Sequence, residues 1–167
     1  MNNEDQRLFF RQVIEQHKGI LYKIARAYCP DTEDRQDLLQ EIMLQIWKSI
    51  SKYDRRFALS TWIYRISLNV AISSYRKKKT TKDIFTSLDN SAENIAEETD
   101  REKEEMLNLL DRFISELNQF DKALLILYLE DKSHAEISDI LGISVSNVGT
   151  RVGRIKEKLK QRFKEII

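Results

Sequence analysis

The chain has 167 residues, of which 41% are hydrophobic and 33% charged, and its formal net charge is +1. This length provides one large domain or two small ones with a real hydrophobic core, and no apolar run approaches the roughly 20 residues that span a bilayer. The first residues lack the basic-then-apolar pattern of a signal peptide, and the single cysteine excludes an internal disulfide. We therefore expect a cytoplasmic protein.

Residues with metal-binding or nucleophilic chemistry are few and scattered. Cys29, His17 and His134 show no paired ligand spacing, and a lone cysteine is most simply interpreted as a small, at least half-buried hydrophobic residue. The sequence contains neither a glycine-rich phosphate-binding loop nor a catalytic-triad motif. It therefore predicts no metal, no cofactor, no small-molecule substrate and no enzymatic activity.

Charge is unevenly distributed along the chain. Residues 52–79 contain eight basic and one acidic side chain, and residues 144–167 contain seven basic and two acidic. Between them, residues 80–105 contain three basic and nine acidic side chains. Two basic segments separated by an acidic one indicate two contacts with a polyanion, joined by a tether. Two solvated faces of an ordinary helical protein would give the same counts.

The composition predicts an all-α protein. One proline and four glycines accompany many Leu, Ile, Glu, Lys and Gln residues. In the N-terminal half, apolar residues at helical spacing predict helices over about 4–29, 32–51 and 60–79. Pro30 is expected to end the first helix, and Ser60 is a candidate N-cap for the third.

Two small helical domains joined by an acidic linker account for the pattern as a whole. Residues 80–105 are polar and acidic with few apolar anchors, which predicts a linker that is helical at most at its end. Helical apolar stripes resume after it. We therefore expect one domain over residues 1–79 and a second over residues 106–167.

The second predicted helix has a polar face that includes a tryptophan. Trp47 lies beside carboxylates, and a large aromatic residue in such a setting indicates a protein–protein contact. A surface helix with one amphipathic tryptophan is an equally good interpretation. The face comprises Asp37, Gln40, Glu41, Leu44, Gln45, Trp47 and Lys48.

The third predicted helix carries a polar stripe, and the segment before it mixes basic with aromatic residues. The stripe, spaced at i, i+4, i+8 and i+11, comprises Arg65, Asn69, Ser73 and Arg76. The preceding segment "SKYDRRFALSTW" suits single-stranded nucleic acid, because cations follow the phosphates while rings stack on exposed bases. Trp62 is better explained as a core residue, whereas Tyr53 and Phe57 fit either role.

The segment "SHAEISDILGISVSNV" predicts a helix-turn-helix. Ser133 and Ser144 are candidate N-caps for its two helices, and Gly142 stands where the turn needs a left-handed residue. The second helix has a core face of Val148, Val152, Ile155 and Leu159. Its outer face and flank hold residue types that reach base edges and phosphates in a major groove: Ser146, Asn147, Thr150, Arg151 and Arg154.

Together, these segments resemble one protein family. "DLLQEIMLQIWKSISKYD", then "STWIYRISLNVAISSYRKKK", then an acidic linker, then "LYLEDKSHAEISDILGISVSNVGTRVGRIKEKLK" occur in the order and spacing of the extracytoplasmic-function sigma factors. These are the small, two-domain members of the bacterial sigma-70 family. The resemblance covers nearly the whole chain and implies an N-terminal domain like sigma region 2 and a C-terminal domain like sigma region 4.

The resemblance also implies three sets of functional residues. In the family, one helix docks on the clamp helices of the largest polymerase subunit, and the matching residues here are Asp37, Gln40, Glu41, Leu44, Trp47 and Lys48. The next loop and helix recognise and melt the −10 promoter element, where the expected residues are Lys52, Tyr53, Arg55, Arg56, Phe57, Ser60, Arg65, Asn69, Ser73, Arg76 and Lys77. The helix-turn-helix reads the −35 element and touches the polymerase flap, with Ser144, Ser146, Asn147, Gly149, Thr150, Arg151, Arg154 and Lys158 expected at the DNA.

Three positions depart from the usual family residues: Ser138, Asn147 and Gly149. Two glycines inside the predicted recognition helix, Gly149 and Gly153, are unusual because each costs about 1 kcal/mol relative to alanine. Both fall on the side away from the core, so bare backbone there would let the helix approach DNA closely. A tolerant surface that accumulated two weak helix formers would explain them equally simply.

The main hypothesis is a dissociable promoter-specificity subunit of bacterial RNA polymerase with no catalytic chemistry of its own. Its expected partners are core polymerase, promoter DNA in double-stranded and melted form, and an anti-sigma factor of the kind that commonly restrains the family. The alternative is an ordinary helix-turn-helix regulator with a ligand-sensing or dimerising N-terminal half, which would bind a palindromic operator without polymerase.

Overall fold

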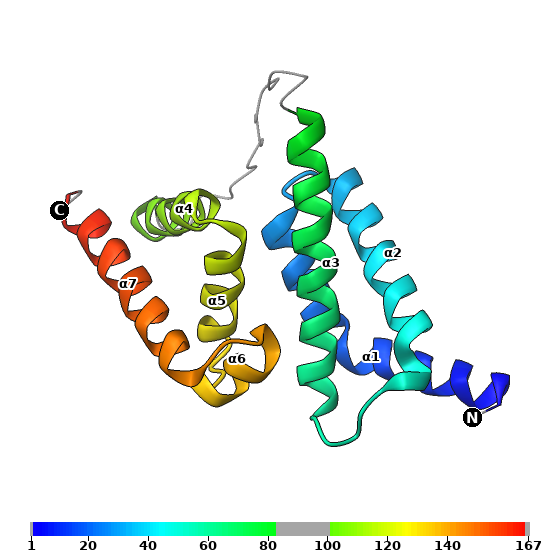
Figure 1. Ribbon diagram of the computed structural model, residues 1–167. Helices are drawn as coiled ribbons and strands as arrows, with labels where there is room; N and C mark the ends of the chain where they lie inside the picture. The colour runs from blue at the N-terminus through cyan, green and yellow to red at the C-terminus, as the bar shows by residue number, and fades with distance from the viewer. Residues whose placement is uncertain (1, 83–100, 166–167) are drawn as a thin grey trace.

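The computed structural model describes residues 2–82 and 101–165, and this part of the chain contains helices and no strands (Figure 1). The predicted all-α class is therefore confirmed. The elements are α1 (Asn3–Tyr28), α2 (Thr32–Ser49), the short 3₁₀ helix η1 (Ile50–Lys52), α3 (Leu59–Lys82), α4 (Arg101–Glu116), α5 (Gln119–Leu129), α6 (His134–Leu141) and α7 (Val145–Lys164).

The helix boundaries differ from the sequence expectations in small but explicable ways. Helix α1 ends where predicted, because Cys29 precedes Pro30 and adopts an extended backbone with φ −132° and ψ 94°. Helix α3 begins at Leu59, one residue before the proposed N-cap Ser60. Helices α3 and α4 extend into both ends of the expected 80–105 linker, and its remaining residues, 83–100, lie outside the described residues.

The N-terminal domain is a three-helix bundle. Helices α1, α2 and α3 contact one another pairwise, and their apolar stripes meet in a hydrophobic core. The central side chains are at most 2% exposed: Leu21, Ile24, Ile42, Ile46 and Ile63. This packing fixes the orientation of the polar faces of α2 and α3, which carry two of the three predicted functional sets.

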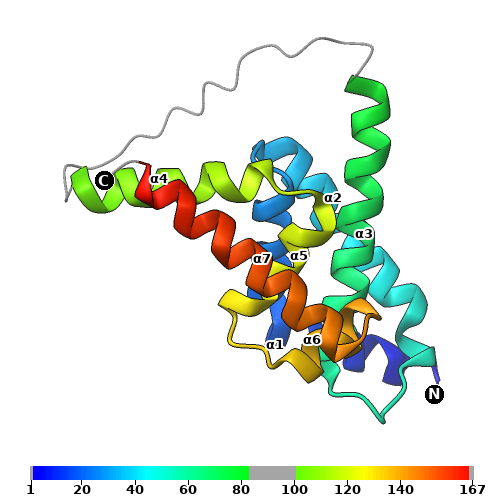
Figure 2. The same ribbon diagram turned by 60° about the vertical axis from the view of Figure 1, so that its left-hand side comes forward.

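The C-terminal domain packs α5, α6 and α7 around a second group of buried residues, with α4 lying across the end of α5 (Figure 2). Leu124, Leu127, Ile137 and Val148 are fully buried there. Helices α5, α6 and α7 each begin with a side chain that accepts a hydrogen bond from the backbone: Asn118, Ser133 and Ser144. Each of these caps satisfies one of the otherwise unpaired N–H groups of a first helical turn.

The two domains are in direct contact. Helix α3 packs against α5 and α6 (Figure 1), and the buried side chains of both domains form one continuous cluster. The hydroxyl of Tyr28 in α1 donates to the carbonyl of Gln119 at the start of α5, at 2.8 Å. Among the described helices, none has the length and apolar character needed to cross a membrane.

Two glycine substitutions offer a matched test of the helix-turn-helix backbone. Gly142 has a φ of 71°, in the left-handed region, whereas Gly153 lies inside α7 with nothing within 4 Å of the position a Cβ would take. We expect Gly142→Ala to destabilise the protein by about 1–2 kcal/mol and Gly153→Ala to stabilise it by up to about 1 kcal/mol. Urea unfolding followed by circular dichroism measures both. Equal effects of the two substitutions would contradict the left-handed turn.

Candidate polymerase and nucleic-acid interfaces

The exposed face of α2 carries most of the residues predicted to dock on polymerase. Five of the six are exposed: Asp37, Gln40, Glu41, Leu44 and Lys48. Leu44 remains 44% exposed despite its apolar side chain. The sixth, Trp47, is half-buried, because its ring packs edge-on against Phe10 of α1 at a centroid distance of 5.3 Å. Trp47 therefore holds α1 against α2 as well as contributing to this face.

The loop between η1 and α3 is organised by its own side chains. The hydroxyl of Tyr53 donates to the carbonyl of Phe57 at 2.6 Å, which closes the loop on itself. The guanidinium of Arg65 lies 5.0 Å from the centre of the Phe57 ring. The Tyr53 and Trp62 rings are 5.2 Å apart. The rings of Tyr53 and Phe57 are thus half-buried in contacts within the protein. These contacts order the loop in the absence of a ligand.

Asp54 and Arg56 form an ion pair at the tip of this loop. Arg56 donates to the Asp54 carboxylate from Nη2 at 2.8 Å and from its backbone N–H at 3.0 Å. The side-chain and backbone hydrogen bonds from Arg56 lower the pKa of Asp54. Arg55, beside them, is exposed. The run "YDRR" in the sequence places Asp54 two residues from its partner.

The polar stripe of α3 lies on an accessible edge of the N-terminal domain. Of the residues predicted to meet the −10 element, seven are exposed: Lys52, Arg55, Arg56, Asn69, Ser73, Arg76 and Lys77. Four are half-buried: Tyr53, Phe57, Ser60 and Arg65. Both aromatic residues of the set are therefore half-buried, whereas most of its cations and small polar residues are exposed.

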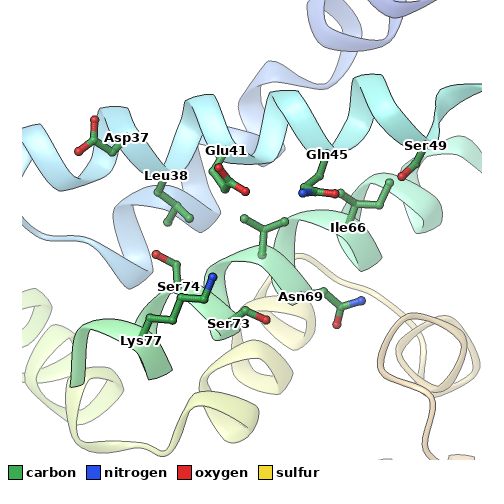
Figure 3. Close-up of a pocket in the computed structure, with 11 residues that line it drawn as sticks. Asp37, Leu38, Glu41, Gln45, Ser49, Ile66, Asn69, Ser73, Ser74 and Lys77 are labelled. Carbon is green, nitrogen blue, oxygen red and sulfur yellow. The ribbon is translucent and has the colours of Figure 1, made fainter. Parts of the chain in front are cut away.

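One open groove joins the α2 face to the α3 stripe (Figure 3). It has a volume of about 590 Å³. Asp37, Glu41 and Gln45 line it from α2, and Asn69, Ser73 and Lys77 line it from α3. The sequence predicted these as two separate surfaces. The structure brings them together, because the bundle core lies just beneath both helices.

The helix-turn-helix has the predicted local geometry. Ser133 accepts from the N–H of Glu136, and Ser144 accepts from the N–H of Asn147, each at 3.1 Å. The hydroxyl of Ser138 donates to the carbonyl of Ile143 at 2.5 Å, which ties the first helix to the turn. This bond gives a structural role to the departure from the family residue at position 138.

The outer face of α7 is only partly free to reach DNA. Five of the predicted −35 residues are exposed: Ser144, Ser146, Thr150, Arg154 and Lys158. Three are half-buried: Asn147, Gly149 and Arg151. The core face is as predicted, since Val148, Val152 and Ile155 are at most 4% exposed. Even on the outer face, Thr150 donates its hydroxyl hydrogen back to the carbonyl of Ser146 at 3.1 Å.

Arg151 is held by the domain itself. Its guanidinium lies 4.8 Å from the centre of the Phe120 ring, and it contacts the Asp121 carboxylate at 3.4 Å. Its Nε also donates to the side-chain oxygen of Asn147 at 3.2 Å. These contacts reach back to α5, so Arg151 and Asn147 lie on a flank that joins α7 to α5. The periodicity of α7 placed Arg151 on this flank but could not reveal the partners on another helix.

Gly149 has a histidine from the preceding helix beside it. A Cβ at position 149 would lie 3.6 Å from Nδ1 and 3.7 Å from Cε1 of His134, whose side chain is exposed. These are ordinary van der Waals distances, so a methyl group would fit beside the imidazole, which lies next to Gly149 on the outer side of the recognition helix. Gly153, by contrast, has nothing within 4 Å of the position its Cβ would take. His134 is a candidate contact that the sequence did not reveal, because only the fold brings α6 over α7.

Within residues 2–82 and 101–165, no three His, Cys, Asp or Glu side chains gather closely enough to hold a metal ion. The surfaces available to a ligand are polar and basic faces of helices on two domains.

Two family models and several known proteins match this chain. Residues 13–81 match the Sigma-70 region 2 family, and residues 107–159 match the Sigma-70 region 4 family. The chain is 32% identical over 128 residues to the RNA polymerase sigma factor SigZ of Bacillus subtilis, covering 75% of this chain and 70% of that one. It is 24% identical over 168 residues to the ECF RNA polymerase sigma factor SigW of the same organism, covering 94% and 90%.

A solved structure shares the fold. The sigma factor RpoE of Bartonella quintana, in a co-crystal with the anti-sigma factor NepR, superposes with a TM-score of 0.74 over 93% of this chain and 96% of that one, at 18% identity. The chain belongs to the extracytoplasmic-function sigma factors of the sigma-70 family. It is accordingly an RNA polymerase sigma factor with a region 4 helix-turn-helix DNA-binding domain, and its family is not enzymatic.

Arg151 and Arg154 form a matched pair of arginines on α7: the first makes contacts that stabilise the fold, and the second is exposed to solvent. Arg151→Ala removes the Phe120 and Asp121 contacts, so we expect a loss of stability of about 1 kcal/mol. Arg154→Ala alters an exposed side chain and should change stability by less than about 0.5 kcal/mol. Thermal and urea unfolding measure both. Equal losses would show that the α5–α7 flank does not depend on Arg151.

Proposed function

We propose that this chain is the dissociable subunit that directs bacterial core RNA polymerase to promoters with its own −10 and −35 elements. In this proposal, α2 docks on core polymerase, the loop at 53–58 with α3 captures the opened −10 strand, and α7 reads the −35 element. The shared groove between α2 and α3 is the observation that carries the proposal. If these assignments hold, the groove would put polymerase docking and strand capture on one bundle, and docking would fix where the strand passes.

The charges along this groove would orient the strand. Asp37 and Glu41 line the α2 side, while Lys77 lies on the α3 side. Carboxylates repel phosphates and cations attract them. A DNA strand would therefore run along α3 and be kept off α2, which leaves the α2 face to the polymerase.

The preformed loop before α3 would lower the cost of holding an unpaired base. Unstacking and unpairing a base costs a few kcal/mol, which contacts in the protein must offset. The Tyr53 and Phe57 rings are already ordered by internal contacts. Little further ordering of the loop is then needed when a base arrives.

For the −35 element, the exposed side chains Ser146, Thr150 and Arg154 are the proposed base readers, with Ser144 and Lys158 at the backbone. Arg151 and Asn147 support the helix from its flank. To these we add His134, whose imidazole lies over Gly149 at the outer face of α7. In a helix-turn-helix the first helix crosses the DNA backbone, so His134 is proposed to contact a phosphate.

An anti-sigma factor is the proposed negative regulator. RpoE, which shares the fold, was solved with its anti-sigma factor NepR. This chain offers polar and basic faces for which such a partner would compete with polymerase and DNA. We expect the protein to act in the cytoplasm, where core polymerase is found.

The central test is promoter-dependent initiation. Purified chain added to core polymerase should raise initiation at promoters of its own genome, and Arg154→Ala should weaken recognition of the −35 element by about 1–3 kcal/mol per lost base contact. Run-off transcription on wild-type and −35-mutated templates measures both effects. The proposal is wrong if no promoter of the source genome responds to the wild-type protein.

A second test concerns His134. His134→Ala should weaken binding to −35 duplexes by about 1 kcal/mol, and by a similar amount on different −35 sequences, because backbone contacts carry no base information. His17→Ala is the matched control, since it removes the other histidine of the chain, which lies on α1 and outside the helix-turn-helix. Holoenzyme binding to −35 duplexes is the measurement. Unchanged affinity of His134→Ala would remove His134 from the interface.

A further inference from the structure

Two lysines in the C-terminal half of α7 lie on the side of the helix that carries its two glycines. Lys156 and Lys160 are exposed and about one helical turn apart. They follow Gly149 and Gly153 at a spacing of seven residues, so all four positions share one side of α7. Neither lysine belongs to the set predicted to meet the −35 element. We call Lys156 and Lys160 the distal lysines.

His134 lies at the beginning of the same side of α7. A Cβ at position 149 would lie 3.6 Å from Nδ1 of His134. At Gly153, between this histidine and the distal lysines, nothing lies within 4 Å of the position a Cβ would take. Three side chains that can donate hydrogen bonds to phosphate thus follow one another along α7.

The distal lysines differ from the paired arginines on the other flank of α7. Arg151 contacts the Asp121 carboxylate at 3.4 Å, and Arg162 pairs with Glu116 of α4. Within residues 2–82 and 101–165, neither distal lysine forms a salt bridge. The cations that face α4 and α5 are therefore neutralised inside the domain, whereas the distal lysines keep their charge for an outside partner.

An aromatic ring positions one of the distal lysines. The Lys156 ammonium lies 4.4 Å from the centre of the Tyr128 ring of α5. A ring face attracts a cation but carries no net charge, so this contact leaves the positive charge available to an anion. Glu157, exposed beside Lys156, forms no salt bridge with either distal lysine in the described part of the chain. This side of α7 is therefore locally positive.

The position of the distal lysines along α7 matches the dimensions of the major groove. At about 1.5 Å per residue, Lys156 lies about 9 Å past Thr150 along the helix axis, and Lys160 lies the same distance past Arg154. The groove is about 12 Å wide, so each sugar–phosphate backbone lies about 6 Å from its middle. With Thr150 and Arg154 at base edges, the distal lysines would lie at a backbone that borders the groove.

Lys158 lies on the opposite flank of the helix. Together with Phe113, Glu116 and Arg162 it lines a hollow of about 300 Å³ between α7 and α4, which lies along that flank (Figure 2). A helix in the major groove has one DNA strand on each flank. Lys158 and the distal lysines would therefore meet different strands.

We propose that Lys156 and Lys160 bind phosphate groups of duplex DNA next to the −35 element, on the strand opposite the one that Lys158 meets. This inference rests on the proposed assignment of α7 to the −35 element. Contacts to phosphates fix the orientation of a protein on the duplex and carry no base information. The distal lysines thus determine how tightly the C-terminal domain holds DNA and how steeply binding depends on salt, while the base readers determine which sequence is bound.

Removal of both charges is the direct test. Each phosphate contact to B-DNA contributes about 0.9 to the slope of log affinity against log salt, so Lys156→Gln/Lys160→Gln should make this slope shallower by about 1.8. A fourfold rise in salt should then cost the wild type about tenfold more affinity than it costs the double variant. Fluorescence anisotropy of the full chain with a labelled −35 duplex measures the slope, and circular dichroism checks the helix content.

Lys18→Gln/Arg26→Gln is the matched control. It removes the same charge from two exposed positions of α1, a helix with no proposed DNA contact. Its slope should equal that of the wild type. Lys160→Gln alone should make the slope shallower by about 0.9, and it keeps the test valid if the double variant does not fold.

Sequence discrimination separates this inference from the proposed function. The distal-lysine variant should keep the wild-type ratio of affinities for intact and mutated −35 duplexes, whereas Arg154→Ala should lower that ratio. A shallower slope in the distal-lysine variant alone would support the phosphate contact even if the wild type showed no preference for any −35 element. In that case only the proposed reading of bases by α7 would fail.

Three results would overturn the phosphate contact even if the protein drives promoter-dependent initiation. The first is an unchanged slope in the distal-lysine variant, and the second is an equal change in the α1 control. The third is a changed ratio of affinities for intact and mutated duplexes, which would make the distal lysines base readers. An unchanged slope together with weaker assembly on core polymerase would identify them as a protein contact instead.

Discussion

Burial of α3 on two flanks is the constraint on which the structure depends. This helix packs against α1 and α2 within its own domain and against α5 and α6 of the other domain. Two small residues of this helix are buried, since Ser67 is fully buried and Ala71 is 1% exposed. A helix buried on two sides has only a narrow strip left for polar residues, and Asn69 and Ser73 occupy it. The strip borders a hollow on each side, so its accessibility depends on how both neighbours are placed.

The sequence could predict the features that depend on local signals. The helix-turn-helix follows from two serine caps and one left-handed glycine, and each of these acts within a few residues of its own position. The core faces of α3 and α7 follow from helical periodicity. These signals also oriented the outer face of α7, so Ser146, Thr150 and Arg154 are found exposed as expected.

Features that depend on contacts between helices could not be predicted in this way. Nothing in the residues around Gly149 indicates that His134 covers it, and nothing near Arg151 points to Asp121. Lys122 is the instructive case. It interrupts the apolar run "FDKALLILYLE", which signals a buried charge or a boundary, but the sequence does not say that tyrosines from another domain receive it. Helical periodicity predicts the direction in which a side chain points, but not the residue that it contacts.

Polar groups buried between the two domains limit how strongly the domains are held together. A core made only of leucine and isoleucine would join the two domains permanently, because removing large apolar surfaces from water is strongly favourable. An interface that also buries an ammonium group and a tyrosine hydroxyl requires each to keep its partner, so its net stability is smaller than its area implies. Such an interface can define a single closed arrangement and still release when a partner competes for one of its faces. Lys122 and Tyr28 are groups of this kind at the boundary between the two domains.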